Sequence, residues 1–156
     1  MSASTHAWPS IETLLPHRAP MLLVDAVRDF TDESICVAAT PAADAWYADT
    51  EGNMPAHIAI ELMAQAIAAH EALTRQRSGL PPAPGVLLGT RRMEAQVASL
   101  PAGAALAVRA TCLLRDSAGN GAYDCTVELD GQTVVSATIK VHQPHDFSAF
   151  LLEHLQ

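Results

Sequence analysis

The distribution of apolar and polar positions along the chain singles out one segment as a long helix. Residues 54–77 contain no glycine and no proline after Pro55, and they are rich in alanine, leucine and methionine. These residue types favour the α-helix. Asn53 is a suitable N-cap, and a proline in the first turn costs no hydrogen bond because its missing N–H would have no partner there. The sequence therefore predicts a helix from Met54 or Pro55 to about Arg77.

This helix is apolar on nearly all of its surface. Between residues 58 and 69 only Glu61 and Gln65 are polar, so we expect the helix to be buried in the protein. At 100° per residue, His57, Glu61 and Gln65 form one polar stripe. A carboxylate on a buried helix is unfavourable unless it is paired, hydrogen-bonded or shifted in its pKa. Glu61 is therefore the first candidate for a functional site.

The segments on either side of this helix have the alternating pattern of strands. Two strands are expected before it and four after it, and a proline- and glycine-rich break at residues 78–85 follows the helix. Gly89 predicts a bulge in the first strand after the break or a close approach of another group to it, and Asp130-Gly131 predicts a type I′ turn between the last two strands. The expected strands are Ala26–Phe30, Ser34–Ala39, Val86–Leu100, Leu106–Arg115, Tyr123–Leu129 and Gln132–Val141, with short helices at Ile11–Leu15 and Phe147–Leu155.

The order of these elements predicts the fold class. Four consecutive strands in a meander have one apolar face that must be covered, and the central helix is the only predicted element apolar enough to cover it. At 156 residues the chain is long enough for one domain with a real core. We therefore expect an α+β protein, a single domain over residues 1–156 with the hotdog architecture, in which an antiparallel sheet wraps around one long buried helix.

Composition and charge exclude several classes of protein. The chain carries 9 basic and 17 acidic residues, a net charge of −8 at pH 7, and no basic run, so nucleic acid is not an expected partner. No segment reaches the ~20 apolar residues that cross a bilayer, and residues 1–10 lack the basic start and apolar core of a secretory signal. The three cysteines, Cys36, Cys112 and Cys125, have no close spacing and predict neither a disulfide framework nor a zinc site. We expect a cytoplasmic protein that does not associate with membranes.

Three segments resemble the FabZ/FabA family of 3-hydroxyacyl-(acyl carrier protein) dehydratases. Residues 15–25, LPHRAPMLLVD, are similar to the LPHRxPFLLVD run of that family, and residues 54–65, MPAHIAIELMAQ, are similar to its MPGVLxxEAMAQ helix start. Residues 129–138, LDGQTVVSAT, are similar to its VDGKVVCEAT hairpin. The three segments follow in the same order as in the family. The PAxxxIExMAQ variant most resembles its ApeP-type branch, the dehydratases of aryl-polyene pigment clusters.

The resemblance implies a catalytic pair, of which this chain has one matching member. The family uses an acidic residue on the central helix, here Glu61, together with a histidine in a GHFPG loop. The matching loop, residues 46–53, contains no histidine. The glycine whose backbone N–H binds the thioester oxygen is Ala56 here, a mild change because the donor belongs to the backbone. With Glu61 as the acid, the expected substrate contacts are Pro55, Ala56 and Gln65.

The missing histidine leaves two sources for the base that removes the C2 proton of the substrate. One is His57, one helical turn before Glu61, and the other is a loop histidine from a second subunit. His17, in the LPHR run, is expected to be structural and to cap backbone groups. A purely structural alternative for Glu61 is an interaction with Arg18 or with a backbone amide. Four histidines near the ends of the chain are expected at the surface: His6, His142, His145 and His154.

Three functions are compatible with these features. The first is the dehydration of 3-hydroxyacyl thioesters on acyl carrier protein, in fatty-acid-like or aryl-polyene biosynthesis. The second is a non-catalytic or half-site hotdog subunit in a heterodimeric dehydratase, and the third is an acyl thioesterase, since hotdog thioesterases also use a helix carboxylate. A homodimer or heterodimer is expected because open sheet edges need cover. No metal or other cofactor is expected, because His57 and Glu61 lack a third ligand nearby and no glycine-rich phosphate loop occurs.

Overall fold

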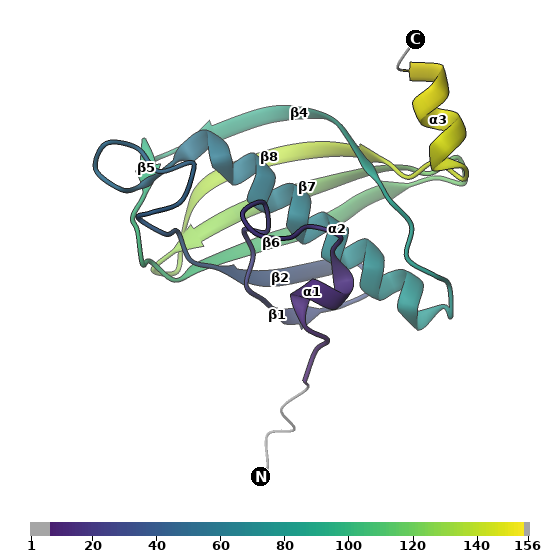
Figure 1. Cartoon of the computed structure of the whole chain (residues 1–156), viewed down its shortest axis with the longest axis horizontal. Helices are drawn as coiled ribbons and strands as arrows, with labels where there is room; N and C mark the ends of the chain where they lie inside the picture. The colour runs from purple at the N-terminus through teal and green to yellow at the C-terminus, as the bar shows by residue number, and fades with distance from the viewer. Residues whose placement is uncertain (1–6, 155–156) are drawn as a thin grey trace.

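The computed structural model of the protein describes residues 7–154. His6 and Leu155, the last residue of the predicted C-terminal helix, lie outside this range. A short helix, three strands and a 3₁₀ turn precede the central helix, and further strands and a C-terminal helix follow it (Figure 1). In chain order the elements are α1 (Ile11–Leu14), β1 (Ala26–Phe30), β2 (Ser34–Ala39), β3 (Met54–Pro55), the 3₁₀ turn η1 (Ala56–Ile58), α2 (Ala59–Arg77), β4 (Val86–Ala95), β5 (Ser99–Leu100), β6 (Leu106–Arg115), β7 (Asn120–Leu129), β8 (Gln132–His142) and α3 (Phe147–His154).

Six of the strands form one antiparallel sheet that curves around α2 (Figure 1). Their order across the sheet is β1-β2-β6-β7-β8-β4, so β1 and β4 are its two edges. The short strands β3 and β5 pair with each other beside the start of the helix. The predicted arrangement of an antiparallel sheet around one long helix is therefore confirmed.

The prediction that all four strands after the helix form one meander is wrong. Strands β6, β7 and β8 do follow one another as antiparallel neighbours, but β4 pairs with β8 at the far edge of the sheet. The predicted single run from Val86 to Leu100 is divided into β4 and β5, which lie in different sheets. Residues 96–105 then lead the chain back to β6 in the middle of the sheet. Local alternation predicts a strand but not its neighbour, because pairing depends on where the connections take the chain.

The start of the central helix also differs from the prediction. Helix α2 begins at Ala59, after β3 and the 3₁₀ turn. Asn53 is not the N-cap, because its side-chain oxygen accepts a hydrogen bond from the backbone N–H of Ala102 at 3.1 Å. Met54 and Pro55 pair with β5 and are thereby held in extended conformation. Tertiary pairing thus overrides the helix propensity of this segment.

The core lies between α2 and the sheet. The buried helix positions follow the spacing of one face of a helix, and they pack against the inward side chains of the strands. The two predicted irregularities of the strands are present. The register shifts between Leu87 and Gly89, and Asp130 and Gly131 have φ of 53° and 76°, the two positive values that a type I′ turn requires. No described helix combines the length and the hydropathy that crossing a bilayer requires.

Candidate active site

A groove with a volume of about 780 Å³ runs along α2. Its walls come from the N-terminal segment at residues 12–18, the break before β4, and the turn between β6 and β7. Polar side chains occupy both ends of its floor, and the middle of the floor is apolar. From the helix, the groove is lined by Glu61, Ala64, Ile67, Ala68, Glu71, Ala72 and Arg75.

At the first end of the groove, Glu61 faces His17. The Nε2 atom of His17 lies 3.8 Å from the Oε1 atom of Glu61. Both side chains are about one third exposed, 30% for the histidine and 34% for the glutamate. Glu61 is thus less buried than the sequence predicted, because its part of the helix opens into the groove. The structure brings together a carboxyl group and an imidazole at a position that small molecules can reach.

Gln65 holds this end of the groove in place. Its side chain is fully buried, and its Nε2 donates to the carbonyl oxygen of Met21 at 2.7 Å and to Oε1 of Glu61 at 3.0 Å. Its Oε1 accepts a hydrogen bond from the backbone N–H of Leu23 at 2.9 Å. Gln65 therefore ties the N-terminal segment to the helix and orients the carboxyl group of Glu61.

The predicted backbone-capping role of His17 is wrong. Within the described residues its Nδ1 is buried without a hydrogen-bond partner, and its Nε2 faces Glu61. Arg18 satisfies the backbone here, because its Nη1 donates to the carbonyl oxygens of Leu15 at 2.8 Å and of His17 at 2.7 Å. Arg18 is accordingly engaged with the backbone and is not the partner of Glu61. The contact between His17 and Glu61 joins segments 44 positions apart, so no local pattern in the sequence indicated it.

Three other predicted site residues are not among the described residues that line the groove. His57 lies in η1 with its side chain exposed, and Pro55 belongs to β3. The backbone N–H of Ala56 donates to the carbonyl oxygen of Ala98 at 3.0 Å. That donor is therefore already occupied in this conformation, and a role in binding the thioester oxygen would require it to be released. The substrate contacts proposed for these residues stay predictions.

The second end of the groove contains a hydrogen-bonded cluster that sequence reasoning missed. The hydroxyl group of Tyr123 donates to Oε1 of Glu71 at 2.5 Å and accepts from Nη2 of Arg115 at 2.8 Å. Nη2 of Arg115 also donates to Oε1 of Glu71 at 2.5 Å, and Nδ1 of His70 lies 2.9 Å from the hydroxyl. Burial, followed by the charge of Glu71, raises the pKa of Tyr123, so its hydroxyl stays neutral. The members come from α2, β6 and β7, and only the tertiary structure assembles them.

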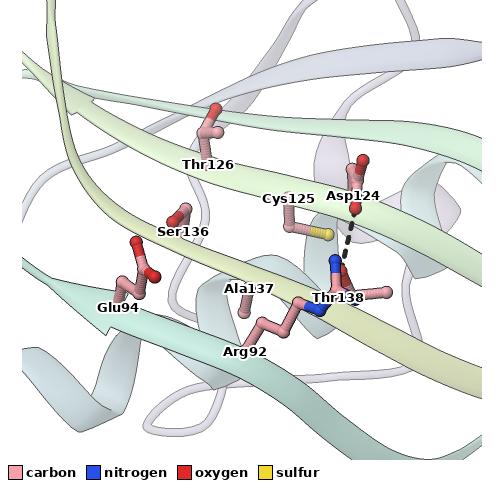
Figure 2. Close-up of a pocket in the computed structure, with 8 residues that line it drawn as sticks. All are labelled: Arg92, Glu94, Asp124, Cys125, Thr126, Ser136, Ala137 and Thr138. Atoms are coloured by element: carbon pink, nitrogen blue, oxygen red, sulfur yellow. Dashed lines mark hydrogen bonds between the residues drawn. The ribbon is translucent and has the colours of Figure 1, made fainter.

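A second hollow, of about 330 Å³, lies over β4, β7 and β8 (Figure 2). Its polar side chains alternate with the buried Cys125 and Ala137, which places them on the face of the sheet opposite α2. The hydroxyl of Thr138 donates to Asp124 across the strands at 2.9 Å (Figure 2). Burial raises the pKa of Cys125 to about 12, so this thiol is neutral and a poor nucleophile. The residues that line this hollow include no histidine, so they do not place an imidazole beside a carboxyl group as the groove does.

The residues described by the structure include no group of three or more histidine, cysteine, aspartate or glutamate side chains that could hold a metal ion. A carboxyl group and an imidazole in contact are suited to general acid–base catalysis, in which one group accepts a proton and the other supplies one.

Two solved structures share the fold of this chain at low identity. One is a variant of the phenylacetic acid degradation protein PaaI from Thermus thermophilus, with 24% identity, 75% of this chain and 90% of that chain covered, and a TM-score of 0.56. The other is a hypothetical thioesterase with coenzyme A from Streptococcus pneumoniae, with 15% identity, 76% and 86% covered, and a TM-score of 0.57. These likenesses concern the fold alone, and they confirm the predicted hotdog architecture.

A third structure is similar over almost its entire length. It is the dehydratase heterocomplex ApeI:P from Xenorhabdus doucetiae, with 26% identity, 95% of this chain and 99% of that chain covered, and a TM-score of 0.87. A comparison with curated proteins gave no match. The model of the ApeP-like family, described as ApeP dehydratase, matches residues 9–152. Because this match extends from the start of the N-terminal segment into α3 and includes both ends of the groove, the chain belongs to the ApeP-like dehydratase family.

Proposed function

We propose that this protein removes water from 3-hydroxyacyl thioesters, with His17 as the base and Glu61 as the acid. The observation that carries the proposal is the 3.8 Å separation of His17 Nε2 and Glu61 Oε1 at the end of a groove with an apolar floor. The family supplies the reaction class, and the pair supplies the two groups that this reaction needs.

The proposed reaction begins with the C2–H bond of the bound thioester. Nε2 of His17 accepts the C2 proton, and the electron pair of that bond moves toward the thioester carbonyl to form an enolate. The enolate then collapses to form the C2–C3 double bond while the C3–O bond breaks. The carboxyl group of Glu61 donates its proton to the departing hydroxyl, and the products are the 2-enoyl thioester and water. Transfer of the proton from His17 back to Glu61, directly or through the product water, restores the starting state.

The geometry of the pair bears on the stereochemistry of this reaction. Two groups only 3.8 Å apart must approach neighbouring carbon atoms of the substrate from the same side. The proton and the hydroxyl are therefore expected to leave from the same face, a syn elimination. Glu61 lies in the first turn of α2, where the partial positive charge of the helix also favours the negative charge that develops on the thioester oxygen.

Gln65 contributes to the proposed site as a positioning residue. Its amide donates to Oε1 of Glu61, which leaves Oε2 to carry the proton for the hydroxyl group. The same side chain fixes the backbone at Met21 and Leu23, and thereby the segment that presents His17. In this proposal Gln65 acts indirectly, through Glu61 and the segment of His17, and its direct contact with the substrate stays a prediction.

A carrier-protein-bound substrate and a second hotdog subunit are part of this proposal. Strand β4 is an open sheet edge, and it exposes Leu87, Leu88 and Met93 by 43%, 55% and 38%. An open edge that exposes several large apolar side chains is suited to cover by another chain. The similar ApeI:P structure is a heterocomplex, which favours a hotdog partner of the same class here. In that assembly the chain would contribute its own acid and base, and a loop histidine from the partner would not be required.

The test is the turnover of a 3-hydroxyacyl thioester by variants of the pair. Glu61→Gln and His17→Ala should each lower the rate by ~10² or more, the usual contribution of general acid–base catalysis. His57→Ala tests the alternative base in this chain and should keep nearly full activity. His154→Ala, at an exposed position of α3, is the control for loss of a histidine. Circular dichroism of each variant verifies that it is folded.

Several results would contradict the proposal. Full activity of folded His17→Ala would remove His17 from the mechanism, and full activity of Glu61→Gln would remove the acid. Loss of turnover in His57→Ala would assign the base to His57, one of the two sources that the sequence left open. Release of free thiol in place of an enoyl product would identify a thioesterase. Absence of turnover by the chain alone, with recovery when a GHFPG-bearing subunit is added, would assign the base to the partner.

A further inference from the structure

The far end of the groove contains polar groups that the proposed reaction does not use. Glu71 follows Glu61 by ten positions along α2, which corresponds to about 15 Å at 1.5 Å per residue. Between them the floor of the groove is formed by Ala64, Ile67 and Ala68. A hydrocarbon chain can lie against these residues, but its end would then meet Glu71 and Arg115.

These two side chains hold each other in place and retain unused hydrogen-bonding atoms. Oε1 of Glu71 and Nη2 of Arg115 are joined to each other and to the buried hydroxyl of Tyr123. Within the described residues, Oε2 of Glu71 and Nη1 of Arg115 have no such partner. Both residues line the groove, and their side chains are 18% and 37% exposed. A fixed acceptor and a fixed donor therefore stand side by side at its end.

The chemistry of this pair restricts what can bind beside it. The charges of Glu71 and Arg115 compensate each other, so neither a carboxylate nor an ammonium group is favoured overall. A hydroxyl group can donate to Oε2 of Glu71 and accept from Nη1 of Arg115 at the same time. A methyl group would displace water from both atoms and give them no hydrogen bond in return, which is unfavourable.

We propose that Glu71 and Arg115 select acyl chains whose far end carries a hydroxyl group. The proposal rests on the proposed function, because it takes the thioester end of the substrate to lie at His17 and Glu61. The length of the groove sets the size of the chain. About 15 Å corresponds to roughly twelve atoms of an extended chain with bonds of ~1.5 Å in a zigzag.

The experiment compares two substrates of equal length. One is the pantetheine thioester of a dodecanoyl chain with hydroxyls at C3 and C12, and the other is that of 3-hydroxytridecanoate, in which a terminal methyl replaces the distal hydroxyl. The protein is assayed in its native assembly. The chain with the distal hydroxyl should be preferred in kcat/KM by roughly 10-fold to 100-fold, the value of a hydrogen bond to a charged group.

The variants are Glu71→Gln and Arg115→Met. Each should reduce this preference to within a few-fold while leaving turnover of the short 3-hydroxybutyryl thioester near its original rate. Arg75→Gln is the matched control, because Arg75 also lines the groove but donates to the carbonyl oxygen of Pro81 and is not part of the cluster. Thermal melting verifies that each variant is folded. If both variants fail to fold, the substrate preference of the unaltered protein still tests the proposal.

A binding measurement separates this proposal from the proposed function. Calorimetry uses amide analogues of the two long chains that lack the C3 hydroxyl and cannot be dehydrated. If the two analogues bind with different affinities but no substrate is turned over, the result contradicts the proposed function and supports the end-group recognition. If the substrates are turned over but the two analogues bind equally well, the end-group recognition is overturned and the proposed function is not. An equal loss for long and short chains in Glu71→Gln would also overturn it, since the cluster would then bind the pantetheine arm common to all substrates.

Discussion

Replacement of Gln65 by leucine tests the arrangement of the proposed site through a residue that lies outside the groove. Gln65 is fully buried and makes three hydrogen bonds, to Met21, Leu23 and Glu61. Leucine has a similar size and a comparable helix propensity, so α2 itself should persist. The change removes the link between the amide of residue 65 and the segment that carries His17.

The expected loss of stability follows from the groups left behind. Each hydrogen bond contributes about 1 kcal/mol net, and a buried partner left unsatisfied costs ~1–3 kcal/mol. The carbonyl of Met21 and the amide of Leu23 are only partly enclosed, so water can replace part of what is lost. Gains from burying the leucine offset a further part. We therefore expect Gln65→Leu to lower the free energy of unfolding by about 2–4 kcal/mol.

Urea denaturation followed by circular dichroism measures this difference. Gln76→Leu makes the same chemical change at an exposed position of the same helix and should alter stability by no more than about 0.5 kcal/mol. Turnover of a 3-hydroxyacyl thioester under conditions where the variant is still folded should fall by at least ~10-fold, because His17 and Glu61 lose their common support. A change below about 1 kcal/mol in Gln65→Leu, together with unaltered turnover, would refute the positioning role.

Two further predictions concern pH dependence and assembly. Burial lowers the pKa of His70 below its ordinary value of 6.5, so the folded protein keeps this ring neutral while the unfolded chain takes up a proton. Its contribution to stability is complete above pH 6.5 and is lost as the pH falls from there toward the folded pKa. This histidine changes the free energy of unfolding by at most ~1.4 kcal/mol per pH unit. His70→Gln should reduce the slope of unfolding free energy against pH in that interval, and an unchanged slope in urea titrations would contradict the assignment. Because the edge at β4 is open and exposes large apolar side chains, sedimentation at micromolar concentration should show at least two hotdog subunits in each particle, whereas a stable, soluble monomer would argue against the proposed assembly.

Much of the architecture followed from local patterns in the sequence. A run of alanine, leucine and methionine without helix breakers predicted the central helix, and the structure ends it at Arg77 as expected. The Asp130-Gly131 turn and the bulge at Gly89 depend on the conformational preferences of a few adjacent residues, and both are present. Features of this kind are determined within one or two turns of chain, so the sequence is sufficient to predict them.

The start of the helix and the position of β4 depended on interactions between distant segments. Met54 and Pro55 are extended because β5 pairs with them, although their local preference is for a helix. β4 pairs with β8 because the connections on either side of it lead to that edge of the sheet. Neither pairing leaves a signal in the residues of the strand itself, since alternation is the same whichever neighbour a strand has.

The candidate site shows the same division between sequence and structure. The sequence identified Glu61 by its polarity on an apolar helix, but it favoured His57 over His17 because His57 lies close in the chain. The structure places His17 beside Glu61, through a segment that Gln65 attaches to the helix. At the other end of the groove, Glu71, Arg115 and Tyr123 come from three elements. Sequence alone determined which residues can carry charge and protons; the tertiary structure decided which of them meet, because those contacts form only when the sheet closes around the helix.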